Sequence, residues 1–407
     1  MKSRFHYKKV KHYLPKSDKD TYAAIYHRGG NTCTRDDTDV ELDFRQESNF
    51  FYLSGVEKAG YQIFILVESD EIYLVKPTVL PSEQLWKGIP ASDEELKRQY
   101  DVDHVITEND LNRLIHHSDP TVIYTFDTTD TGMIPCRFHP RLDFIALKTA
   151  THEARLTKFP WEIRSLRYAA HISSHAHIDL MIQVAKGRKK DIKESELEAR
   201  FPSGPRAAVL HYTDNNKMIP NKDPHALILV DAGGEYECYG SDVSRTFPAC
   251  GKFSNEAKTI YNIVLKAQKA QVIQSDWIVM MLEGKMVKCL SVSNLQLANM
   301  PFRKNIGIFR KSRFSGVKGG DPLEFFDRPL EENMIVTVEP GLYFNDVSID
   351  LWTSSPNYQQ YFDLSKIHQY RVVGGVRIED TILITSRGYE NLTIAPKEVS
   401  DIEAIMK

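Results

Sequence analysis

The feature that most constrains this chain is a set of four acidic residues that lie at or inside apolar, strand-like runs. Asp231 and Glu339 each end such a run, and a Pro-Gly turn follows Glu339 at once. Asp242 lies on the strand-like segment after a Gly-Gly turn, and Glu379 interrupts an apolar run. A buried carboxylate is costly unless it is paired or binds a cation. We therefore expect the fold to bring these four acids together.

The segment between Asp231 and Asp242 has the pattern of a β-hairpin. If the hairpin is centred between Tyr236 and Glu237, the two aspartates lie directly opposite each other, because both are equally far from the centre. Opposed side chains have Cβ atoms about 4.5–5.5 Å apart. Two carboxylates this close repel each other, and a bound cation removes the repulsion.

The charge of the four acids favours a centre with two metal ions. Four carboxylates carry four negative charges, which two divalent cations balance. Such paired ions lie about 3.5–4 Å apart and activate a water molecule. Oxygen ligands favour Mn²⁺ or Mg²⁺ over softer metals. Strand alternation also places Arg377 on the same face as Glu379. The alternative, four unrelated acids with surface partners, stays open at this level.

Composition limits the class of protein. The chain has 407 residues, a formal net charge of -3, 26% charged residues and 42% hydrophobic residues. These values are typical of a globular protein and exclude a disordered chain. No apolar stretch reaches the roughly 18 residues of a membrane span. The five cysteines are odd in number and form no CxxC pair, which favours a reducing compartment. We expect a cytoplasmic protein with no nucleic-acid or membrane partner.

Hydrophobic periodicity suggests two regions. The first 150 residues have a mixed α/β pattern, with the β-rich runs Tyr61–Val67 and Glu71–Val75 expected to form a hairpin. A linker is expected near Lys148–Lys158. The remaining expected elements are helices over 160–187 and 254–274 and strands around 334–344 and 372–384.

Three motifs resemble those of a known family. The segments DAGGEYECYGSDVSRTFP (231–248), VTVEPGLYF (336–344) and GGVRIED (374–380) resemble the metal-binding segments of the pita-bread metallopeptidases. The branch is that of the Xaa-Pro aminopeptidases and Xaa-Pro dipeptidases (prolidases). The run FRQESNFFYLSG (44–55) resembles the start of their non-catalytic domain.

The resemblance implies a fold of the α/β (α+β) class. Residues 1–150 would form a small N-terminal α/β domain of the aminopeptidase P type. Residues 151–407 would form a pita-bread domain with a curved antiparallel sheet. Family members often dimerise, so a homodimer is an expectation as well.

The resemblance also implies a chemistry and a cofactor. The activity would be that of a manganese-dependent Xaa-Pro aminopeptidase, acting on peptides with proline at the second position through a hydroxide that bridges two metal ions. Each subunit would bind two Mn²⁺ ions. Asp231 would chelate one ion, Asp242 and Glu379 would bridge both, and Glu339 would bind the other ion and carry the proton. His211 would lie beside the substrate.

Arg377 would support the metal ligands from outside the metal centre, by the same resemblance. The chain departs from the family in two places. It has no histidine between His225 and His368, where the family has a metal-binding histidine, and a basic stretch with no acid, Lys285–Lys318, stands there instead. Near 197–206 the chain is shorter than the family pattern, which has a further strand and loop. Errors of the gene model in 197–206 and 275–325 would explain both departures, and so would a genuine degenerate homologue.

Three activities therefore stay open. The first is an Xaa-Pro aminopeptidase, impaired if the missing histidine matters. The second is an Xaa-Pro dipeptidase. The third is a non-catalytic pita-bread homologue that binds peptides or proteins. A separate pair, His171 and His175, has the i, i+4 spacing of some zinc ligands but lacks the glutamate of a zinc-protease helix. We expect these two histidines to be solvated or to serve packing.

Overall fold

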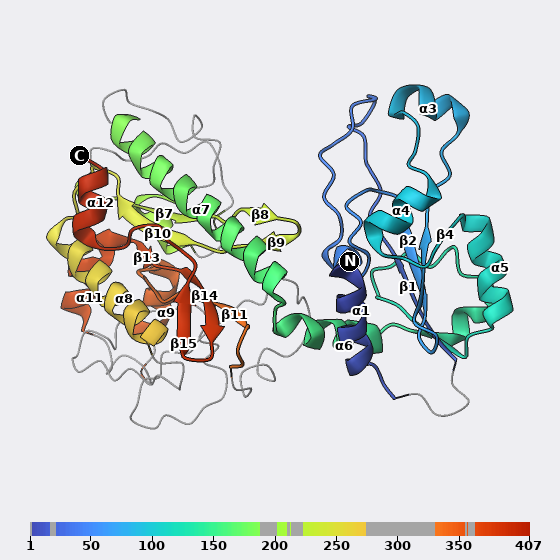
Figure 1. Ribbon diagram of the computed structural model, residues 1–407. Coiled ribbons are helices and arrows are strands. Elements are labelled where there is room, and N and C mark those ends of the chain that lie inside the picture. Colours follow the sequence, from blue (N-terminus) through green and yellow to red (C-terminus); the bar gives the residue numbers. More distant parts are fainter. Residues whose placement is uncertain are drawn as a thin grey trace. The chain divides into compact units, whose positions relative to one another are not determined.

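The structure is a computed structural model, and Figure 1 shows its ribbon. It describes residues 2–16, 22–187, 202–209, 212, 223–273, 330–354, 356 and 363–407. The contacts divide the chain into unit 1, Met1–Leu156, and unit 2, Thr157–Lys407.

The division falls after a helix that was not predicted from the sequence. Helix α6 (Ala146–Leu156) covers most of the region predicted to be a linker, so that prediction is wrong. Its apolar residues Leu147, Ala150 and Ala154 belong to the core of unit 1. Burial of this helix face therefore keeps residues 151–156 with the N-terminal unit, and the predicted boundary after residue 150 would cut the helix.

Unit 1 is a mixed sheet with helices on both faces. Its six strands lie in the order β4-β3-β2-β1-β5-β6. The pairs β1–β2 and β2–β3 are antiparallel, which confirms the expected hairpin, whereas β1–β5, β3–β4 and β5–β6 are parallel. Besides α6, the elements of unit 1 are α1 (Lys2–Tyr13), β1 (Ala23–Arg28), α2 (Ser48–Ser54), β2 (Gln62–Leu66), β3 (Glu71–Val75), α3 (Pro81–Lys87), α4 (Asp93–Tyr100), β4 (His104–Ile106), α5 (Glu108–Ser118), β5 (Val122–Tyr124), the 3-10 helix η1 (Cys136–Arg141) and β6 (Leu142–Asp143).

The central strand β1 shows why both faces of this sheet are covered. Ala23 and Ile25 pack into one apolar cluster, and Ala24 and Tyr26 pack into another. Because successive side chains of a strand point to opposite faces, an uninterrupted apolar strand needs a core on each side.

Unit 2 is built from antiparallel strands covered by long helices. The expected helices over 160–187 and 254–274 are confirmed as α7 and α8. The elements of unit 2 are α7 (Pro160–Gly187), η3 (Gly204–Ala208), β7 (Leu227–Asp231), β8 (Glu235–Tyr236), β9 (Tyr239–Gly240), β10 (Ser244–Pro248), α8 (Asn255–Ile273), β11 (Ile335–Val338), β12 (Gly341–Tyr343), α9 (Asp346–Thr353), α11 (Leu364–Tyr370), η5 (Arg371–Val373), β13 (Gly375–Arg377), β14 (Asp380–Thr385), β15 (Gly388–Asn391) and α12 (Val399–Ile405).

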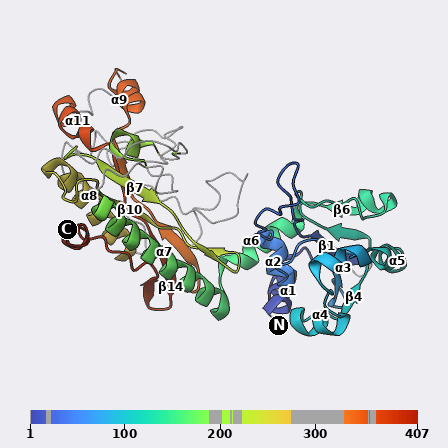
Figure 2. The same cartoon turned by 90° about the horizontal axis from the view of Figure 1, so that it is seen from above.

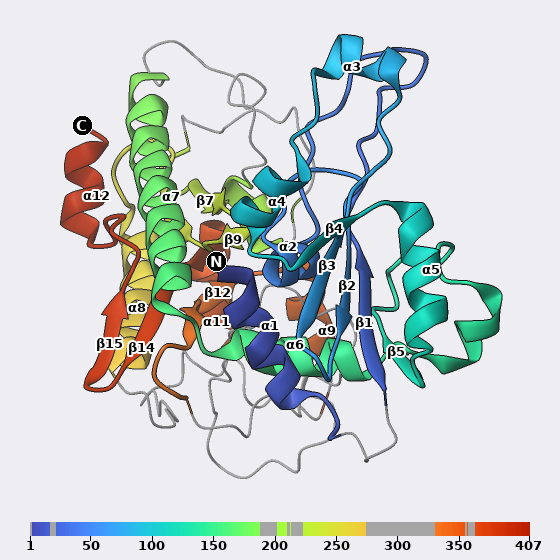
Figure 3. The ribbon, with the colours of Figure 1, turned by 45° about the vertical axis from the view of Figure 1, so that its right-hand side comes forward.

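The helices of unit 2 cover one face of these strands. Figure 2 shows α7 lying along β7 and β10, and Figure 3 shows α12 beside α7. Ile228, Val230 and Phe247 join residues of α7, α8 and α12 in the largest core cluster of the described chain. Because side chains alternate along a strand, the residues between them point to the other face. That face carries the candidate site.

Among the described residues, none of the helices combines the length and apolar character needed to cross a membrane.

Candidate metal centre

Strand register brings three of the four predicted acids into one row. Ser244 on β10 pairs with Asp231 on β7, and an isolated bridge pairs Ser244 with Glu379 on its other side. The β11–β14 and β12–β13 pairs keep one register, with Val338 opposite Asp380 and Gly341 opposite Arg377. This register places Glu339 across from Glu379. One row therefore reads, strand by strand, Asp231, Ser244, Glu379 and Glu339.

Asp242 lies in the neighbouring row, which corrects the predicted hairpin register. The turn residues are Glu237 and Cys238, both at positive φ (49° and 60°), so the hairpin centre lies one residue later than predicted. Asp231 consequently faces Ser244, and Asp242 is its diagonal neighbour on the same face. Diagonal neighbours still lie within reach of each other. The prediction missed the centre because a Glu-Cys turn lacks the Asn-Gly or Asp-Gly signature of such tight turns.

A glycine lets the strand of Asp242 approach the end of β7. A Cβ atom on Gly233 would lie 1.8 Å from the carbonyl oxygen of Ser241. No other residue type fits so close to a neighbouring backbone. Gly233 is thus needed for packing beside the site, whereas the turn expected at Gly-Gly lies at Glu237 and Cys238.

The carboxylates meet closely enough to share a cation. Ligand oxygens of Asp231, Asp242 and Glu379 all lie within 4.8 Å of one another. Glu379 is only 1% exposed. Burial, followed by the charges of Asp242, Glu339 and Asp231, raises its pKa well above the ordinary value. These acids therefore repel one another, and the charge of Arg377 offsets only part of that effect on Glu379.

One atom of this cluster indicates what would fill it. Glu379 Oε2 accepts a hydrogen bond from Ser244 Oγ at 2.8 Å, whereas Oε1 is buried and has no hydrogen-bond partner among the described residues. A buried polar atom without a partner needs an explanation. A divalent cation provides one, since carboxylate oxygens are ligands of hard cations. The residues present therefore fit a divalent metal site.

Arg377 connects the residues of this row through hydrogen bonds. Its guanidinium donates to Asp231 Oδ2 at 2.5 Å, to Ser244 Oγ at 2.9 Å and to the hydroxyl of Tyr343 at 3.1 Å. Ser244 in turn donates to Glu379, so one arginine orients two acids, one directly and one through a hydroxyl. The predicted position of Arg377 beside Glu379 follows from alternation, but its contact with Asp231 does not.

Sequence reasoning missed two threonines that hold the backbone of the site. Thr381 Oγ1 accepts from the Asp242 N–H at 3.2 Å and donates to the Asp242 carbonyl at 2.9 Å. Thr246 Oγ1 accepts from the Arg377 N–H at 3.0 Å and donates to its carbonyl at 2.9 Å. The available signal was spacing: Thr381 lies two residues after Glu379, on the same strand face.

On the face opposite the four acids, a buried ion pair joins β10 to β14 next to Glu379. Arg245 and Asp380 are both 0% exposed, and Arg245 Nη2 donates to Asp380 Oδ1 at 2.7 Å. Arg245 Nη1 also donates to the carbonyl of Glu379 at 2.7 Å. Burial alone would raise the pKa of Asp380, but the charges of Arg245 and Lys397 outweigh it and the pKa is lowered. Arg245 therefore holds the carbonyl of Glu379 from the face opposite the four acids.

Some sequence predictions concern residues outside the described part of the chain. These are His211, the basic stretch Lys285–Lys318, and the segments 197–201 and 275–325. The described residues after 201 cover part of one strand edge. The N–H of Leu229 donates to the carbonyl of Pro202 at 3.0 Å. The edge of β7 is thus paired at this point, although the chain is shorter here than the family pattern.

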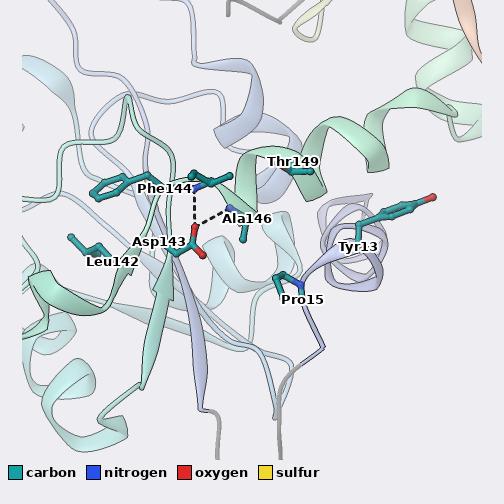
Figure 4. A pocket seen from close by; sticks show the side chains of 8 residues that line it. Tyr13, Pro15, Leu142, Asp143, Phe144, Ala146 and Thr149 are labelled. Atoms are coloured by element: carbon teal, nitrogen blue, oxygen red, sulfur yellow. Dashed lines mark hydrogen bonds between the residues drawn. The ribbon is translucent and has the colours of Figure 1, made fainter. Parts of the chain in front are cut away.

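Unit 1 has a cavity of about 680 Å³ between the end of α1 and the start of α6 (Figure 4). Asp143 Oδ1 accepts from the N–H groups of Ile145 at 2.8 Å and Ala146 at 2.9 Å, and so caps α6. None of the predicted site residues lines this cavity, whose walls are Tyr13, Pro15, Leu142, Asp143, Phe144, Ile145, Ala146 and Thr149.

Comparison with known proteins assigns both parts of the chain. A family model described as metallopeptidase family M24 matches residues 164–386, and a model described as the aminopeptidase P N-terminal domain matches residues 6–123. The protein named "Probable Xaa-Pro aminopeptidase PEPP" of Uncinocarpus reesii is 32% identical over 465 aligned residues, covering 99% of this chain and 94% of the relative. "Probable Xaa-Pro aminopeptidase pepP" of Botryotinia fuckeliana is 31% identical over 445 aligned residues, covering 98% and 96%.

These alignments are longer than the 407 residues of this chain. Each relative therefore has residues with no counterpart here, in line with the departures noted in the sequence.

Solved structures show the same fold. The aminopeptidase PepP of Pseudomonas aeruginosa matches with a TM-score of 0.71 and 24% identity, covering 100% of this chain and 98% of that one. The proline aminopeptidase P II of Yersinia pestis matches with a TM-score of 0.70 and 22% identity, covering 100% and 99%. The expected class is confirmed: an N-terminal α/β domain of the aminopeptidase P type, followed by a pita-bread domain with antiparallel sheets.

Proposed function

Because the chain belongs to metallopeptidase family M24, a family of hydrolases, we propose that it is an Xaa-Pro aminopeptidase that removes an N-terminal residue preceding proline. The names of its relatives support this substrate class. The observation that carries the proposal is the cluster of Asp231, Asp242 and Glu379, in which the buried Oε1 of Glu379 has no hydrogen-bond partner among the described residues.

We propose that Asp231, Asp242, Glu339 and Glu379 hold two divalent cations, and that these are Mn²⁺. When bound, such ions supply a Lewis acid and lower the pKa of a water molecule. The four negative charges of the acids balance two divalent ions. All of these donors are carboxylate oxygens, which suit Mn²⁺ better than softer metals. Arg377 would keep one oxygen of Asp231 occupied and leave the other for the metal.

Cleavage of the Xaa-Pro peptide bond requires a group that delivers a proton to the proline nitrogen. This nitrogen carries no hydrogen and leaves as a secondary amine, so it must receive a proton as the bond breaks. We propose that Glu339 takes the proton of the attacking water and delivers it to this nitrogen. Its position across from Glu379 at the end of β11 supports the assignment. We also propose that His211 helps to stabilise the carbonyl oxygen of the substrate.

Because this chain lacks the metal-binding histidine expected from the family, its activity would test whether the carboxylates alone can hold the metal ions. With no histidine between 225 and 368, one metal ion would depend on Asp242, Glu339 and Glu379 alone. We propose that its metal affinity is lower than in relatives that keep an imidazole. Gene-model errors in 197–206 and 275–325 remain our explanation for the departures, and sequencing the transcript tests it.

The experiment compares an Xaa-Pro-Pro tripeptide with an Xaa-Pro dipeptide during a titration with Mn²⁺. Glu379→Ala removes a proposed ligand, and Glu390→Ala on β15 is the matched control, because Glu390 pairs with Arg167 at the surface. Mn²⁺-dependent cleavage of the tripeptide that is lost only in Glu379→Ala supports an aminopeptidase. Preferred cleavage of the dipeptide would identify a dipeptidase, and no cleavage by folded protein would favour the non-catalytic homologue.

We extend the proposal to location and assembly. The four cysteines in the described part of the chain, Cys33, Cys136, Cys238 and Cys250, form no disulfide bond, which supports a reducing compartment such as the cytoplasm. We also propose that the protein forms a homodimer, and light scattering, which measures the molar mass in solution, tests this.

A further inference from the structure

The exposed side of α7 carries two histidines whose Nε2 atoms lie close to each other. His171 and His175 lie one turn apart and are both exposed. Their Nε2 atoms are 3.3 Å apart, and their ring centroids are 4.5 Å apart. Residues four apart on a helix are neighbours on one side. The spacing seen in the sequence therefore becomes an actual meeting of two ligand atoms.

We propose that His171 and His175 form a second, independent metal site that chelates Zn²⁺ or a similar borderline metal ion. Zn–N bonds of 2.0–2.1 Å at a tetrahedral angle require the two nitrogens to lie about 3.3–3.4 Å apart. The observed separation of 3.3 Å meets this requirement. In the metal-free chain one imidazole donates its Nε2–H to the other, and when both Nε2 atoms bind the metal ion each neutral ring carries its hydrogen on Nδ1.

The third histidine of this stretch is excluded. His177 is 2% exposed, and its Nε2 lies 3.0 Å from the carbonyl oxygen of Ala232. Burial lowers its pKa, which keeps it neutral as the donor of this bond. Two of the three histidines of α7 are therefore available to a metal ion.

The surroundings of the pair favour a cation. Asp179 lies one turn after His175 and is exposed, so its negative charge favours a cation on this side of the helix. Arg167 lies one turn before His171, and Glu390 binds its guanidinium at 3.0 and 2.8 Å. The positive charge closest in sequence on this side of the helix is thus already paired.

The donor atoms distinguish this site from the carboxylate cluster. Imidazole nitrogens suit Zn²⁺, Ni²⁺ and Cu²⁺, whereas carboxylate oxygens suit Mn²⁺. The two sites should therefore fill with different ions. The proposal does not depend on peptidase activity and can fail or hold separately from it.

The test is a calorimetric titration of the full chain with Zn²⁺ while Mn²⁺ is held in excess. The variant His171→Gln/His175→Gln removes both ligands from an exposed surface. The matched control is His116→Gln/His117→Gln on α5, which also removes two exposed imidazoles. Adjacent residues of a helix do not face each other, so His116 and His117 do not chelate.

We expect one Zn²⁺ binding event to disappear in the His171/His175 variant and to remain in the control. A single substitution, His175→Gln, should weaken that event at least about tenfold, because a chelate becomes a single ligand. Unchanged Zn²⁺ binding in the His171/His175 variant would overturn the proposal. An equal loss in both double variants would overturn it too, as would Zn²⁺ binding that only Glu379→Gln abolishes.

Discussion

Replacing Glu379 by glutamine should stabilise the metal-free protein and weaken its response to metal. The substitution keeps the shape of the side chain and leaves an oxygen to accept from Ser244. The new amide replaces an oxygen that has no hydrogen-bond partner among the described residues and faces two other acids. An N–H donor at that place suits the neighbouring carboxylates better than a second acceptor.

The size of the effect follows from the distances. Two unit charges 4.8 Å apart repel by about 3.5 kcal/mol at an effective dielectric constant of 20. Asp231 and Asp242 both lie within that distance of Glu379. Glu379 can escape the repulsion by keeping a proton, which limits the penalty to about 1.4 kcal/mol per pH unit above its ordinary pKa. We expect the metal-free variant to be about 2–4 kcal/mol more stable at pH 8.

The difference in stability between variant and wild type depends on pH. The pKa of Glu379 is raised in the folded state, so the unfolded chain loses its proton first as the pH rises. The wild type therefore loses stability relative to the variant above about pH 4.3, until the folded carboxyl also ionises. Below that pH the two proteins should have similar stability.

The assay is thermal unfolding of wild type and variant in chelator and in Mn²⁺. A gain of 2–4 kcal/mol corresponds to a rise of roughly 4–16 °C in the midpoint for a domain of this size. Mn²⁺ at a hundred times its Kd adds about 2.7 kcal/mol to the wild type. A tenfold weaker Kd in the variant lowers that gain by about 1.4 kcal/mol.

Glu390→Gln is the control for the loss of a negative charge. It removes a surface ion pair with Arg167 and should cost about 0–1 kcal/mol at pH 8, the opposite sign. If metal-free Glu379→Gln is less stable than the wild type at pH 8, the four acids do not repel as argued. The inference of a cation site would then lose its main support.

Three further changes test other parts of unit 2. Thr381→Val removes the hydroxyl that binds both backbone groups of Asp242 and should weaken Mn²⁺ binding about tenfold in calorimetry, whereas Thr381→Ser should keep it. Cys238→Gly relieves a residue at φ 60° and should raise the free energy of unfolding by about 0.5–1 kcal/mol in urea, whereas Cys238→Ala should not. His177 has a lowered pKa through burial, so the unfolded chain takes up the proton first as the pH falls below about 6.5, and folding loses up to about 1.4 kcal/mol per pH unit. His177→Gln should make urea unfolding less sensitive to acid in that range.

Each of these expectations has an outcome against it. Equal Mn²⁺ affinity in Thr381→Val and Thr381→Ser would show that the hydroxyl does not position Asp242. A loss of stability in Cys238→Gly would mean that the side chain contributes more than the turn conformation costs. The same acid dependence in His177→Gln would assign that dependence to other groups.

Local pattern was sufficient for much of the fold and for the chemical type of the site. The periodicity over 160–187 predicted α7 with its observed bounds, and the apolar runs predicted the β2–β3 hairpin. The four acids were recognisable because a carboxylate in an apolar strand is costly wherever the strand packs. Alternation put Arg377 on the face of Glu379, since that relation spans only two residues.

Relations between distant segments needed the tertiary structure. The row of Asp231, Ser244, Glu379 and Glu339 depends on three strand pairings, each set by packing far from the turn. A shift of one residue in any pairing would turn the side chains of that strand to the other face. The hairpin centre was missed by one residue because its Glu237-Cys238 turn lacks a recognisable turn signature.

The charged residues and the segments able to form strands and helices could be predicted from local sequence, because they follow from neighbours along the chain. The contacts between atoms of distant segments arise from folding: Arg377 with Asp231, Thr381 with the backbone of Asp242, and, through side-chain packing on one helix, His171 with His175. Such contacts depend on strand register and on side-chain rotamers. Both are chosen by the packing of the whole unit, which no local pattern contains.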